Sequence, residues 1–318
     1  MSVLAAEAEE YHSKDFEWET LKQQIENEPS LQYHLLPFHP SQGEEGPEND
    51  SDAWKRFHSR HSSGKFFKER RYLLKEFPEL VSCGESSKLL EVGCGNGSTV
   101  LPILRGNENI IVYACDCSSD ILERANEYVD AADIASVKDR FHPFYCDFCT
   151  TGLPEWLACS SCQENFPQRQ RDCFSDIEEK KRTHLTCLLR ESGCCIGGMD
   201  FITLIFTLSA VPLERMPTAI TECYSVLKPG GLLLFRDYGL YDMTMLRFKP
   251  EQRVGLREYM RADGTRSYFF TVDTVRNLFV NAGFIEVALE YCCVKSVNQG
   301  KGKTMLRVWV HGKFQRPL

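Results

Sequence analysis

Three glycines at alternate positions follow a short apolar run in LLEVGCGNGS, the ten residues from Leu89 to Ser98. The apolar run is typical of a buried strand, and the residues after Gly97 are compatible with a helix. A strand–turn–helix junction needs small residues where a nucleotide-like ligand approaches the backbone, which favours Gly93, Gly95 and Gly97 as a binding turn. Such a turn alone is a weak signal, so its flanking residues must decide the chemistry.

Two aspartates are placed to complete a nucleotide site. Asp116 ends the next expected strand, nineteen residues after Gly97, and Asp147 ends the following one. A carboxylate at the first position accepts hydrogen bonds from both ribose hydroxyls, and one at the second can receive an adenine amino group. The alternative is that both aspartates only cap helices. We predict a cofactor cleft where the three strands end.

Strands and helices are expected to alternate from residue 88 onward, which predicts a parallel sheet with helices on both faces. The expected strands are 88–92, 110–115, 141–146, 200–208 and 232–236, with a final hairpin of about 285–294 and 305–314. The expected helices are about 98–105, 119–128, 213–227 and 271–282. A turn, KPGG at 228–231, is expected before the fifth strand.

The composition is that of a globular chain with a large core: 318 residues, 42% hydrophobic and 26% charged. It contains no apolar run of 18 residues and no signal-peptide pattern, so we expect no membrane association and a cytoplasmic location, with the nucleus as an alternative. Fifteen cysteines is an odd count that cannot pair completely, and we expect reduced thiols.

Charge divides the chain. Residues 1–52 carry thirteen acidic side chains and two lysines, whereas the remaining 266 residues have a net charge of +3. We predict that 1–52 is an acidic, partly disordered extension with a short helix at about 13–26 and a linker at 41–52. It would serve as a docking arm or simply as a solvated tail.

Residues 53–87 form a basic segment in which aromatic side chains are interleaved. Between Trp54 and Leu80, eight lysines and arginines face three glutamates. Cations neutralise phosphates and aromatic faces stack on bases, so this segment suits a cofactor lid or an RNA contact. The alternative is an amphipathic helix whose aromatics pack on the domain. The candidate RNA contacts here are Arg56, Lys65, Lys68 and Arg70.

A cysteine-rich stretch of weak periodicity, about 150–198, interrupts the strand–helix pattern, and we interpret it as an insertion. Cys146-x-x-Cys149 and Cys159-x-x-Cys162 have spacings that zinc sites use. Cys146, however, belongs to a strand end beside Asp147, which restricts its geometry. We therefore expect reduced thiols without a metal.

The G-x-G-x-G turn preceded by Glu91, the aspartate after the second strand and the late KPGG turn together resemble class I S-adenosylmethionine-dependent methyltransferases. The resemblance implies a Rossmann-like α/β domain over 88–318. Its sheet would be mostly parallel and seven-stranded, with an antiparallel last strand and helices on both faces. S-adenosyl-L-methionine would be the cofactor.

Longer strings resemble a narrower family. FFKERRYLLKEFPEL (66–80), LIFTLSAVPLERM (204–216), LFRDYGLYDMTMLRFK (234–249), DGTRSYFFT (263–271) and the closing RVWVHGKFQRP look like the tRNA N3-methylcytidine methyltransferases. The resemblance implies methylation of cytidine N3 at position 32 of the anticodon loop in serine, threonine or arginine tRNAs. A partner such as seryl-tRNA synthetase is implied for some members.

The resemblance also implies cofactor contacts: Trp54, Gly93, Asp116, Asp147, Phe148 and Ile205, with Gly95 and Gly97 in the same turn. One departure is His58, which stands where the family's W-D-x-F-Y box has tyrosine. Histidine can still stack or donate a hydrogen bond. The insertion after Asp147 is a second departure, because it is longer than expected of the family.

Methylation of N3 creates a cationic ring, so a carboxylate near the base would stabilise the developing charge. We predict that Asp237, directly after the fifth strand, has this role, with Tyr238 or Tyr241 stacking on the base. As an alternative, Asp237 is an ion-paired structural residue. The candidate phosphate contacts outside the basic segment are Arg236, Arg247, Arg261 and Arg266. Two other functions stay open: a methyltransferase for a small molecule or protein, and a non-catalytic RNA-binding subunit.

Overall fold

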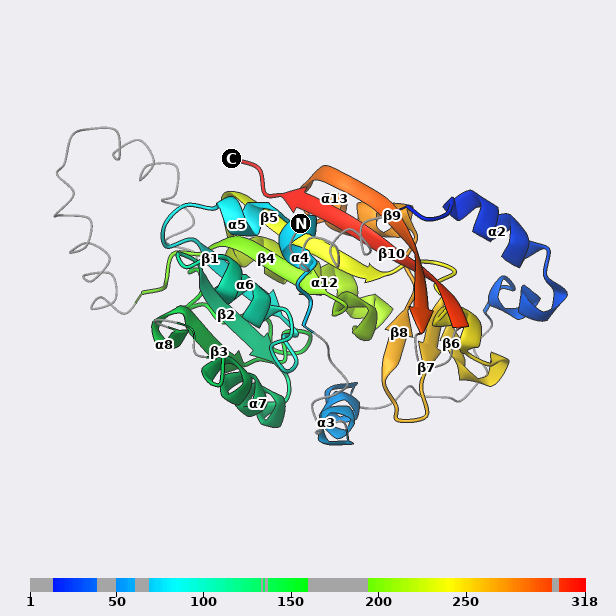
Figure 1. Cartoon of the computed structure of the whole chain (residues 1–318), viewed down its shortest axis with the longest axis horizontal. Helices are drawn as coiled ribbons and strands as arrows, with labels where there is room; N and C mark the ends of the chain where they lie inside the picture. The colour runs from blue at the N-terminus through cyan, green and yellow to red at the C-terminus, as the bar shows by residue number, and fades with distance from the viewer. Residues whose placement is uncertain are drawn as a thin grey trace.

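A seven-stranded sheet runs across the computed structural model (Figure 1), in the order β3-β2-β1-β4-β5-β10-β9. The structure describes residues 14–38, 50–60, 69–132, 134, 137–159, 194–298 and 303–318. Neighbours from β3 to β5 pair in parallel, and β10 is antiparallel to both β5 and β9. The prediction of a mostly parallel sheet with an antiparallel last strand is confirmed.

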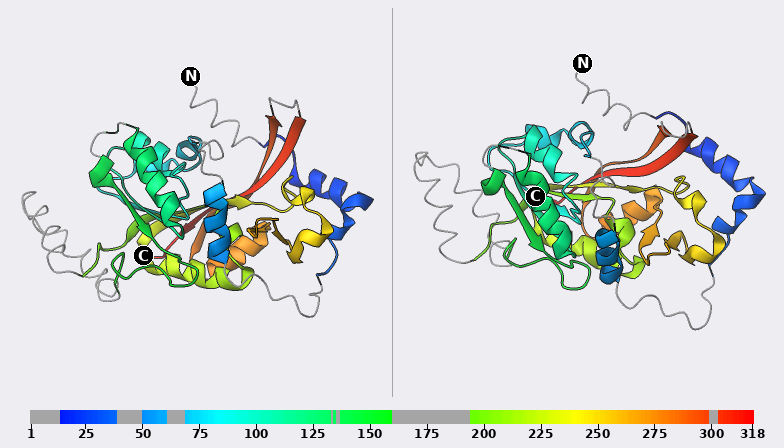
Figure 2. Two further views of the ribbon diagram at one scale, coloured as in Figure 1. Left: turned by 90° about the horizontal axis from the view of Figure 1, so that it is seen from below. Right: turned by 60° about the horizontal axis from the view of Figure 1, so that its bottom comes forward.

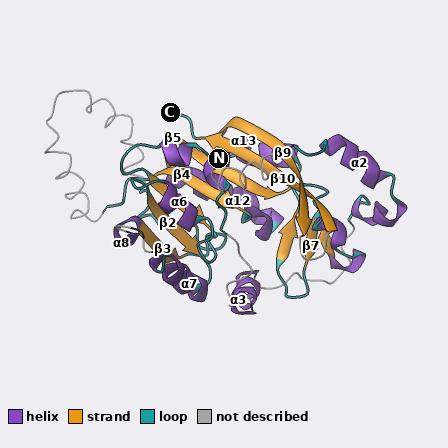
Figure 3. Cartoon of the chain, in the orientation of Figure 1, coloured by secondary structure: helices purple, strands orange, loops and turns teal. Residues whose placement is uncertain are grey.

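The elements alternate as the sequence predicts, with ends that differ by a few residues (Figure 3). The strands of the large sheet are β1 (Lys88–Val92), β2 (Ile111–Asp116), β3 (Phe141–Tyr145), β4 (Met199–Ile205), β5 (Leu227–Tyr238), β9 (Ile285–Asn298) and β10 (Lys303–Gln315). The helices are α2 (Trp18–Glu26), α3 (Asp50–Arg60), α4 (Leu73–Glu76), α5 (Glu79–Ser82), α6 (Val100–Gly106), α7 (Ser119–Asp130), α8 (Val137–Arg140), α12 (Met216–Val226) and α13 (Val272–Asn281). The 3-10 turns are η1 (Pro29–His34), η2 (Leu208–Ala210), η3 (Leu213–Arg215), η4 (Met245–Arg247) and η5 (Pro250–Gln252). Among the described residues, no helix combines the length and apolar character that crossing a membrane requires.

Alternate residues of the central strands enter two separate apolar layers, because successive side chains of a strand point to opposite faces. Leu90 and Leu233 pack in the layer formed by α12 and α13. Leu89 and Leu234 pack in the layer formed by α4 to α7. Helices therefore cover both faces, and the strand ends are the part of the sheet left to bind a ligand.

A second, smaller sheet was not predicted. It consists of β6 (Arg253–Gly255), β7 (Glu258–Met260) and β8 (Arg266–Tyr268), and it lies with α2 at one end of the molecule (Figure 2). Leu21 and Ile25 of α2 are buried in a cluster that includes side chains of this region. The N-terminal segment thus packs against the α/β part of the chain. Of the predicted linker at 41–52, residues 41–49 lie outside the described residues and the last three belong to α3.

The predicted KPGG turn is a bulge inside β5 rather than a turn before it. Strand pairing passes from Met199 opposite Leu227 directly to Phe201 opposite Leu232, so extra residues of β5 have no partner in β4. Gly230 within the bulge has φ +77°, a conformation that favours glycine. The glycines of KPGG do mark an irregular backbone, as predicted, but β5 begins before them, at Leu227, and not after them.

A buried ionic cluster joins helix α4 to strands β5 and β10 of the large sheet. Arg236 of β5 donates to Glu76 of α4 over 2.5 Å, and neither side chain is exposed to solvent. His311 of β10 is 2.8 Å from the same carboxylate oxygen. Burial alone would raise the pKa of Glu76, but the charge of Arg236 and the His311 contact hold it below its ordinary value. Glu76 is therefore an anion inside the protein and depends on these partners.

We predict that Glu76→Ala lowers the free energy of unfolding by about 3–5 kcal/mol, because it leaves a buried guanidinium without a counter-charge. Glu79→Ala is the matched control. Its carboxylate pairs with Lys313 at 2.6 Å but is 31% exposed, so the loss should stay below about 1 kcal/mol. Denaturant unfolding of both variants gives the comparison, and equal losses would contradict a special role for the buried pair.

Candidate active site

The glycine turn after β1 is held against the ends of two neighbouring strands. The amides of Gly93 and Cys94 both donate to the carbonyl oxygen of Cys115, over 2.9 and 3.0 Å. Gly93 has φ +71°, and a Cβ atom there would lie 2.6 Å from Cγ2 of Thr207. Thr207 is fixed in turn, because its hydroxyl donates to the carbonyl of Val92 over 2.9 Å. Only glycine fits at position 93 without displacing a neighbour.

Asp116 is fixed beside this turn. Its Oδ2 accepts a hydrogen bond from the Gly95 amide (3.0 Å), and its Oδ1 accepts one from the Ser118 amide (3.1 Å). Nε2 of His58 lies 4.0 Å from the same carboxylate. Burial raises the pKa of Asp116, and the nearby His58 opposes that shift. The aspartate predicted to bind a ribose is thus adjacent to the turn predicted to bind the rest of the cofactor.

Helix α3, which precedes the alternating strands and helices in the sequence, forms one wall of the site. It is anchored by Ala53 and Phe57, which are 1% and 8% exposed. Trp54 packs edge-on against Phe57, with ring centroids 5.2 Å apart. Ser51, at the start of the helix, donates to the Asp147 carboxylate. The helix therefore covers the strand ends in the manner of a lid.

Together these elements enclose a cavity of about 520 Å³ at the carboxyl ends of the parallel strands. The predicted cofactor contacts that line it are Trp54, His58, Gly93, Gly95, Asp116, Asp147, Phe148 and Ile205. Gly97 belongs to the same turn but faces Ala125. The structure therefore brings these predicted residues together around one cavity, and their contact with a cofactor stays a prediction.

Two polar atoms in the cavity wall fit the methionine end of S-adenosylmethionine, which carries an ammonium and a carboxylate. The indole N–H of Trp54 and Oδ1 of Asn96 are buried and have no hydrogen-bond partner among the described residues. The first is a donor for a carboxylate, and the second is an acceptor for an ammonium. Asn96 is not among the residues predicted from the sequence. Its position between Gly95 and Gly97 in the glycine turn is the feature that could have indicated a role in binding.

The other half of the cavity lies at the carboxyl ends of β4 and β5 and beside the middle of β10, and it is aromatic. Phe206 and Tyr238 have ring centroids 5.1 Å apart, and Phe206 and Trp309 are 6.3 Å apart. Phe206 has φ +57°, which is a strained conformation for a bulky residue. Its amide donates to the carbonyl of Arg236 over 2.8 Å, which helps to hold it. Three rings around a cavity are suited to a flat heterocycle.

Arginines surround this aromatic half. The ones that line the cavity are Arg70, Arg215, Arg261, Arg266 and Arg307. Arg266 pairs with Glu258 and Arg307 with Asp242, each over 2.8 Å. Within the described part of the chain, Arg215 and Arg261 have no ion-pair partner, and Arg261 donates to the hydroxyl of Thr265 over 3.3 Å. Arg215 was not predicted from the sequence.

The three residues predicted to act on the substrate lie in different places. Tyr238 lines the cavity. Asp237 is fully buried behind the wall, where its carboxylate accepts the amides of Ser209 (2.9 Å) and Tyr238 (2.8 Å). Burial raises the pKa of Asp237 to about 6. Tyr241 does not line the cavity, because it is buried beneath α2 and donates to Glu26 over 3.1 Å.

The predicted phosphate contacts also divide. Arg70, Arg261 and Arg266 face the cavity, and Arg56 and Arg247 are exposed on the surface. The prediction for Arg236 is wrong: its guanidinium has no solvent-exposed surface and is occupied by Glu76. Lys65 and Lys68 lie outside the described residues.

Glu91, the acidic residue before the glycine turn, is completely buried in β1. Its Oε2 accepts a hydrogen bond from the hydroxyl of Thr203 on the neighbouring strand β4. Burial raises the pKa of Glu91 to about 7, against the pull of the Thr203 hydrogen bond. A carboxyl group that titrates near neutral pH therefore lies beneath the cofactor half of the cavity.

The strand order and the cleft at the carboxyl ends of the strands define a class I S-adenosylmethionine-dependent methyltransferase. A family model for a methyltransferase domain matches residues 66–289. A solved S-adenosylmethionine-dependent methyltransferase from Anabaena variabilis has the same fold, with a TM-score of 0.54 and 14% identity over 87% of this chain and all of that one.

Curated relatives narrow the class. A rat protein named tRNA N(3)-cytidine methyltransferase METTL6 is 37% identical over 268 residues, 83% of this chain and 78% of the relative. A Xenopus tropicalis protein named tRNA N(3)-cytidine methyltransferase METTL2 is 31% identical over 95% of this chain and 88% of the relative. The chain belongs to the tRNA N(3)-cytidine methyltransferase family.

We predict that Gly93→Ala weakens S-adenosylmethionine binding or folding by on the order of 1–3 kcal/mol, because the new methyl group meets Thr207 in a strained backbone conformation. Calorimetric titration and denaturant unfolding measure the two effects. Gly84→Ala is the control, since nothing lies within 4 Å of a Cβ atom there. Wild-type values for both properties in Gly93→Ala would show that the turn is not constrained.

We predict that the buried Glu91 makes stability depend on pH. The pKa of Glu91 is 4.5 when unfolded and about 7 when folded, so the native state holds the proton more tightly. That contribution is complete below about pH 4.5 and is lost as the pH rises through 7. Against neutral Glu91→Gln, the wild type should lose on the order of 3 kcal/mol of unfolding free energy over this range. Parallel stability curves for the two proteins would refute this assignment.

Proposed function

We propose that this protein transfers a methyl group from S-adenosylmethionine to N3 of cytidine at position 32 in the anticodon loop of tRNA. One observation carries the proposal: a single cavity joins a cofactor half on β1 to β3 with an aromatic, arginine-rimmed half on β4, β5 and β10. The names of the curated relatives, which describe tRNA N(3)-cytidine methyltransferases, support the choice of acceptor atom.

The residues present suit a substrate that needs little acid–base help. S-adenosylmethionine, when bound, supplies an activated methyl group, and cytidine N3 has an in-plane lone pair near neutral pH. The protein's task is then to hold the base, which must leave its stack because N3 lies on the pairing edge. Phe206, Tyr238 and Trp309 can stack on the flipped ring and exclude water around it.

Charge development on the base is matched by the surroundings. The product ring is cationic, and aromatic faces attract a cation. Arg266 and Arg307 are neutralised by their carboxylate partners, which limits repulsion of that product. Arg215 and Arg261 lack such partners in the described part of the chain and would contact the phosphates of the loop.

Asp237 acts in this proposal as a positioning residue. Its two oxygens hold the amides of Ser209 and Tyr238, which both border the cavity. In Asp237→Asn one acceptor becomes a donor that faces an N–H group, so that one of these hydrogen bonds is lost. The side chain shapes the substrate half without touching the base.

The experiment uses purified protein, S-adenosylmethionine and transcribed tRNA, and measures N3-methylcytidine by nucleoside mass spectrometry. We expect the product in tRNA that carries cytidine at position 32 and none when that base is uridine. Methyl transfer to protein or a small molecule instead of tRNA would overturn the proposal. So would failure to bind S-adenosylmethionine, which is the expected result for a non-catalytic RNA-binding subunit.

Two variants test the roles in the same assay. Tyr238→Ala should lower kcat/KM roughly tenfold or more through lost stacking, whereas Tyr145→Ala, 53% exposed on β3, should not. Asp237→Asn should lower kcat while S-adenosylmethionine binding, measured by calorimetry, is retained. Full activity of both Tyr238→Ala and Asp237→Asn would exclude these positions from the substrate half.

We also propose, on the family resemblance, that the substrates are serine, threonine or arginine tRNAs and that a partner such as seryl-tRNA synthetase assists the reaction. We further propose a cytoplasmic location, with the nucleus as the alternative. The same assay with each tRNA, with and without the synthetase, tests the subset and the partner.

A further inference from the structure

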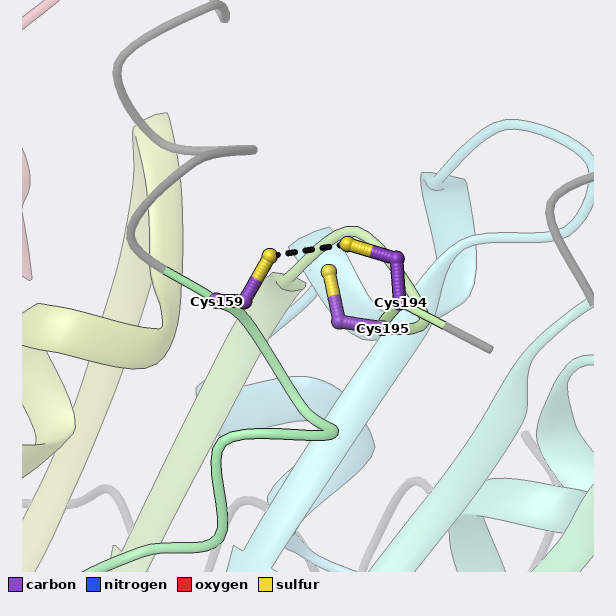
Figure 4. A group of neighbouring side chains, drawn as sticks. All are labelled: Cys159, Cys194 and Cys195. Atoms are coloured by element: carbon purple, nitrogen blue, oxygen red, sulfur yellow. Dashed lines mark hydrogen bonds between the residues drawn. The ribbon is translucent and has the colours of Figure 1, made fainter. Parts of the chain in front are cut away.

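Three cysteines gather at the base of the insertion that interrupts the α/β pattern. The Sγ atoms of Cys159, Cys194 and Cys195 all lie within 4.8 Å of one another and point toward a common centre (Figure 4). Sγ of Cys159 is 3.0 Å from Sγ of Cys194, although 35 positions separate the two residues in the sequence. The fold therefore brings together thiols that the sequence spacing alone does not.

The backbone around these cysteines is fixed. The amide of Ile196 donates to the carbonyl of Trp156, and that of Gly198 to the carbonyl of Leu157, each over 2.8 Å. Leu157 is completely buried in the core, and Lys88 donates to the carbonyl of Ile196. The two chain segments that carry the thiols are thus bound to each other and to the start of β1.

We propose that Cys159, Cys194 and Cys195 bind a zinc ion. A tetrahedral zinc with Zn–S bonds of about 2.3 Å separates its sulfurs by about 3.8 Å, a value between the observed 3.0 Å contact and the 4.8 Å limit of the group. A disulfide would use two of the thiols and leave the third unexplained. Zinc prefers thiolate ligands, and the three cysteines supply three of the four positions of its tetrahedron.

The zinc site has a structural role, because it lies near the amino-terminal ends of β1 and β4, whereas the cavity lies at the carboxyl ends of the parallel strands. Cys195 precedes β4, whose other end at Ile205 lines the cavity, and Lys88 is likewise the first residue of β1. The ion would join Cys159 to Cys194 across 35 positions of the sequence, and a cross-link between distant positions stabilises the folded state. It would also anchor Trp156, whose ring packs on Phe144 of β3 with centroids 4.9 Å apart.

The experiment measures the metal content of the full-length protein purified without chelator, by plasma mass spectrometry. We expect about one zinc per chain in the wild type and in Cys83→Ser, a partly exposed cysteine elsewhere on the surface. Cys194→Ser and Cys195→Ser should lose most of the zinc. A chelator should lower the melting temperature of the wild type but not of these two variants.

A second measurement keeps the test decisive if the variants do not fold. X-ray absorption at the zinc edge of the wild-type protein should show at least three sulfur neighbours at about 2.3 Å. Fewer sulfur neighbours, or zinc retained in full by Cys194→Ser and Cys195→Ser, would overturn the proposal. So would metal-free protein, whether mass spectrometry under non-reducing conditions finds a Cys159–Cys194 disulfide or reduced thiols.

Discussion

Arg236 carries its charge at a position where none of its side chain reaches solvent, and much of the molecule is arranged around it. Glu76 neutralises it, and the rings of Tyr72 and Trp309 lie over the guanidinium at 4.9 and 4.4 Å. Both rings also line the cavity. One buried ion pair therefore fixes α4, strand β5 and the aromatic half of the site in a single arrangement.

The cofactor half depends on a different kind of constraint, which is backbone geometry. Gly93 lies so close to Thr207 that no side chain fits there. The carboxylate of Asp116 accepts a hydrogen bond from the amide of Gly95. These contacts tie β1, β2 and the loop after β4 together through hydrogen bonds within the protein. The relative positions of the glycine turn and Asp116 are therefore fixed by the backbone.

The two ends of the parallel strands have different roles in the structure. The cavity lies at the carboxyl ends of the strands. Its wall contains polar atoms without partners in the described part of the chain, a strained backbone at Phe206, and arginines, all of which suit ligand binding. At the amino-terminal ends of the strands, three thiols and backbone hydrogen bonds hold the two ends of the insertion together. A cysteine-rich addition after Asp147 can be accommodated because its ends meet on the side of the sheet away from the cavity.

Local patterns in the sequence are sufficient for the fold class and for predicting which residues of the glycine turn and strand ends line one half of the cavity. Glycines, aspartates and alternating strands and helices are local signals, since each follows from backbone sterics or from the period of one element. Gly93, Asp116 and Asp147 can therefore be placed from the sequence alone.

The rest of the site depends on the tertiary structure. Asp237 and Tyr238 are adjacent in the sequence, but opposite side-chain directions along a strand put the first behind the cavity wall and the second in it. The sequence wrongly predicts Arg236 as a phosphate contact, because its partner Glu76 is 160 positions away. The small sheet β6–β8, the packing of α2 and the meeting of three cysteines likewise depend on contacts between distant segments, which no local pattern of residues encodes.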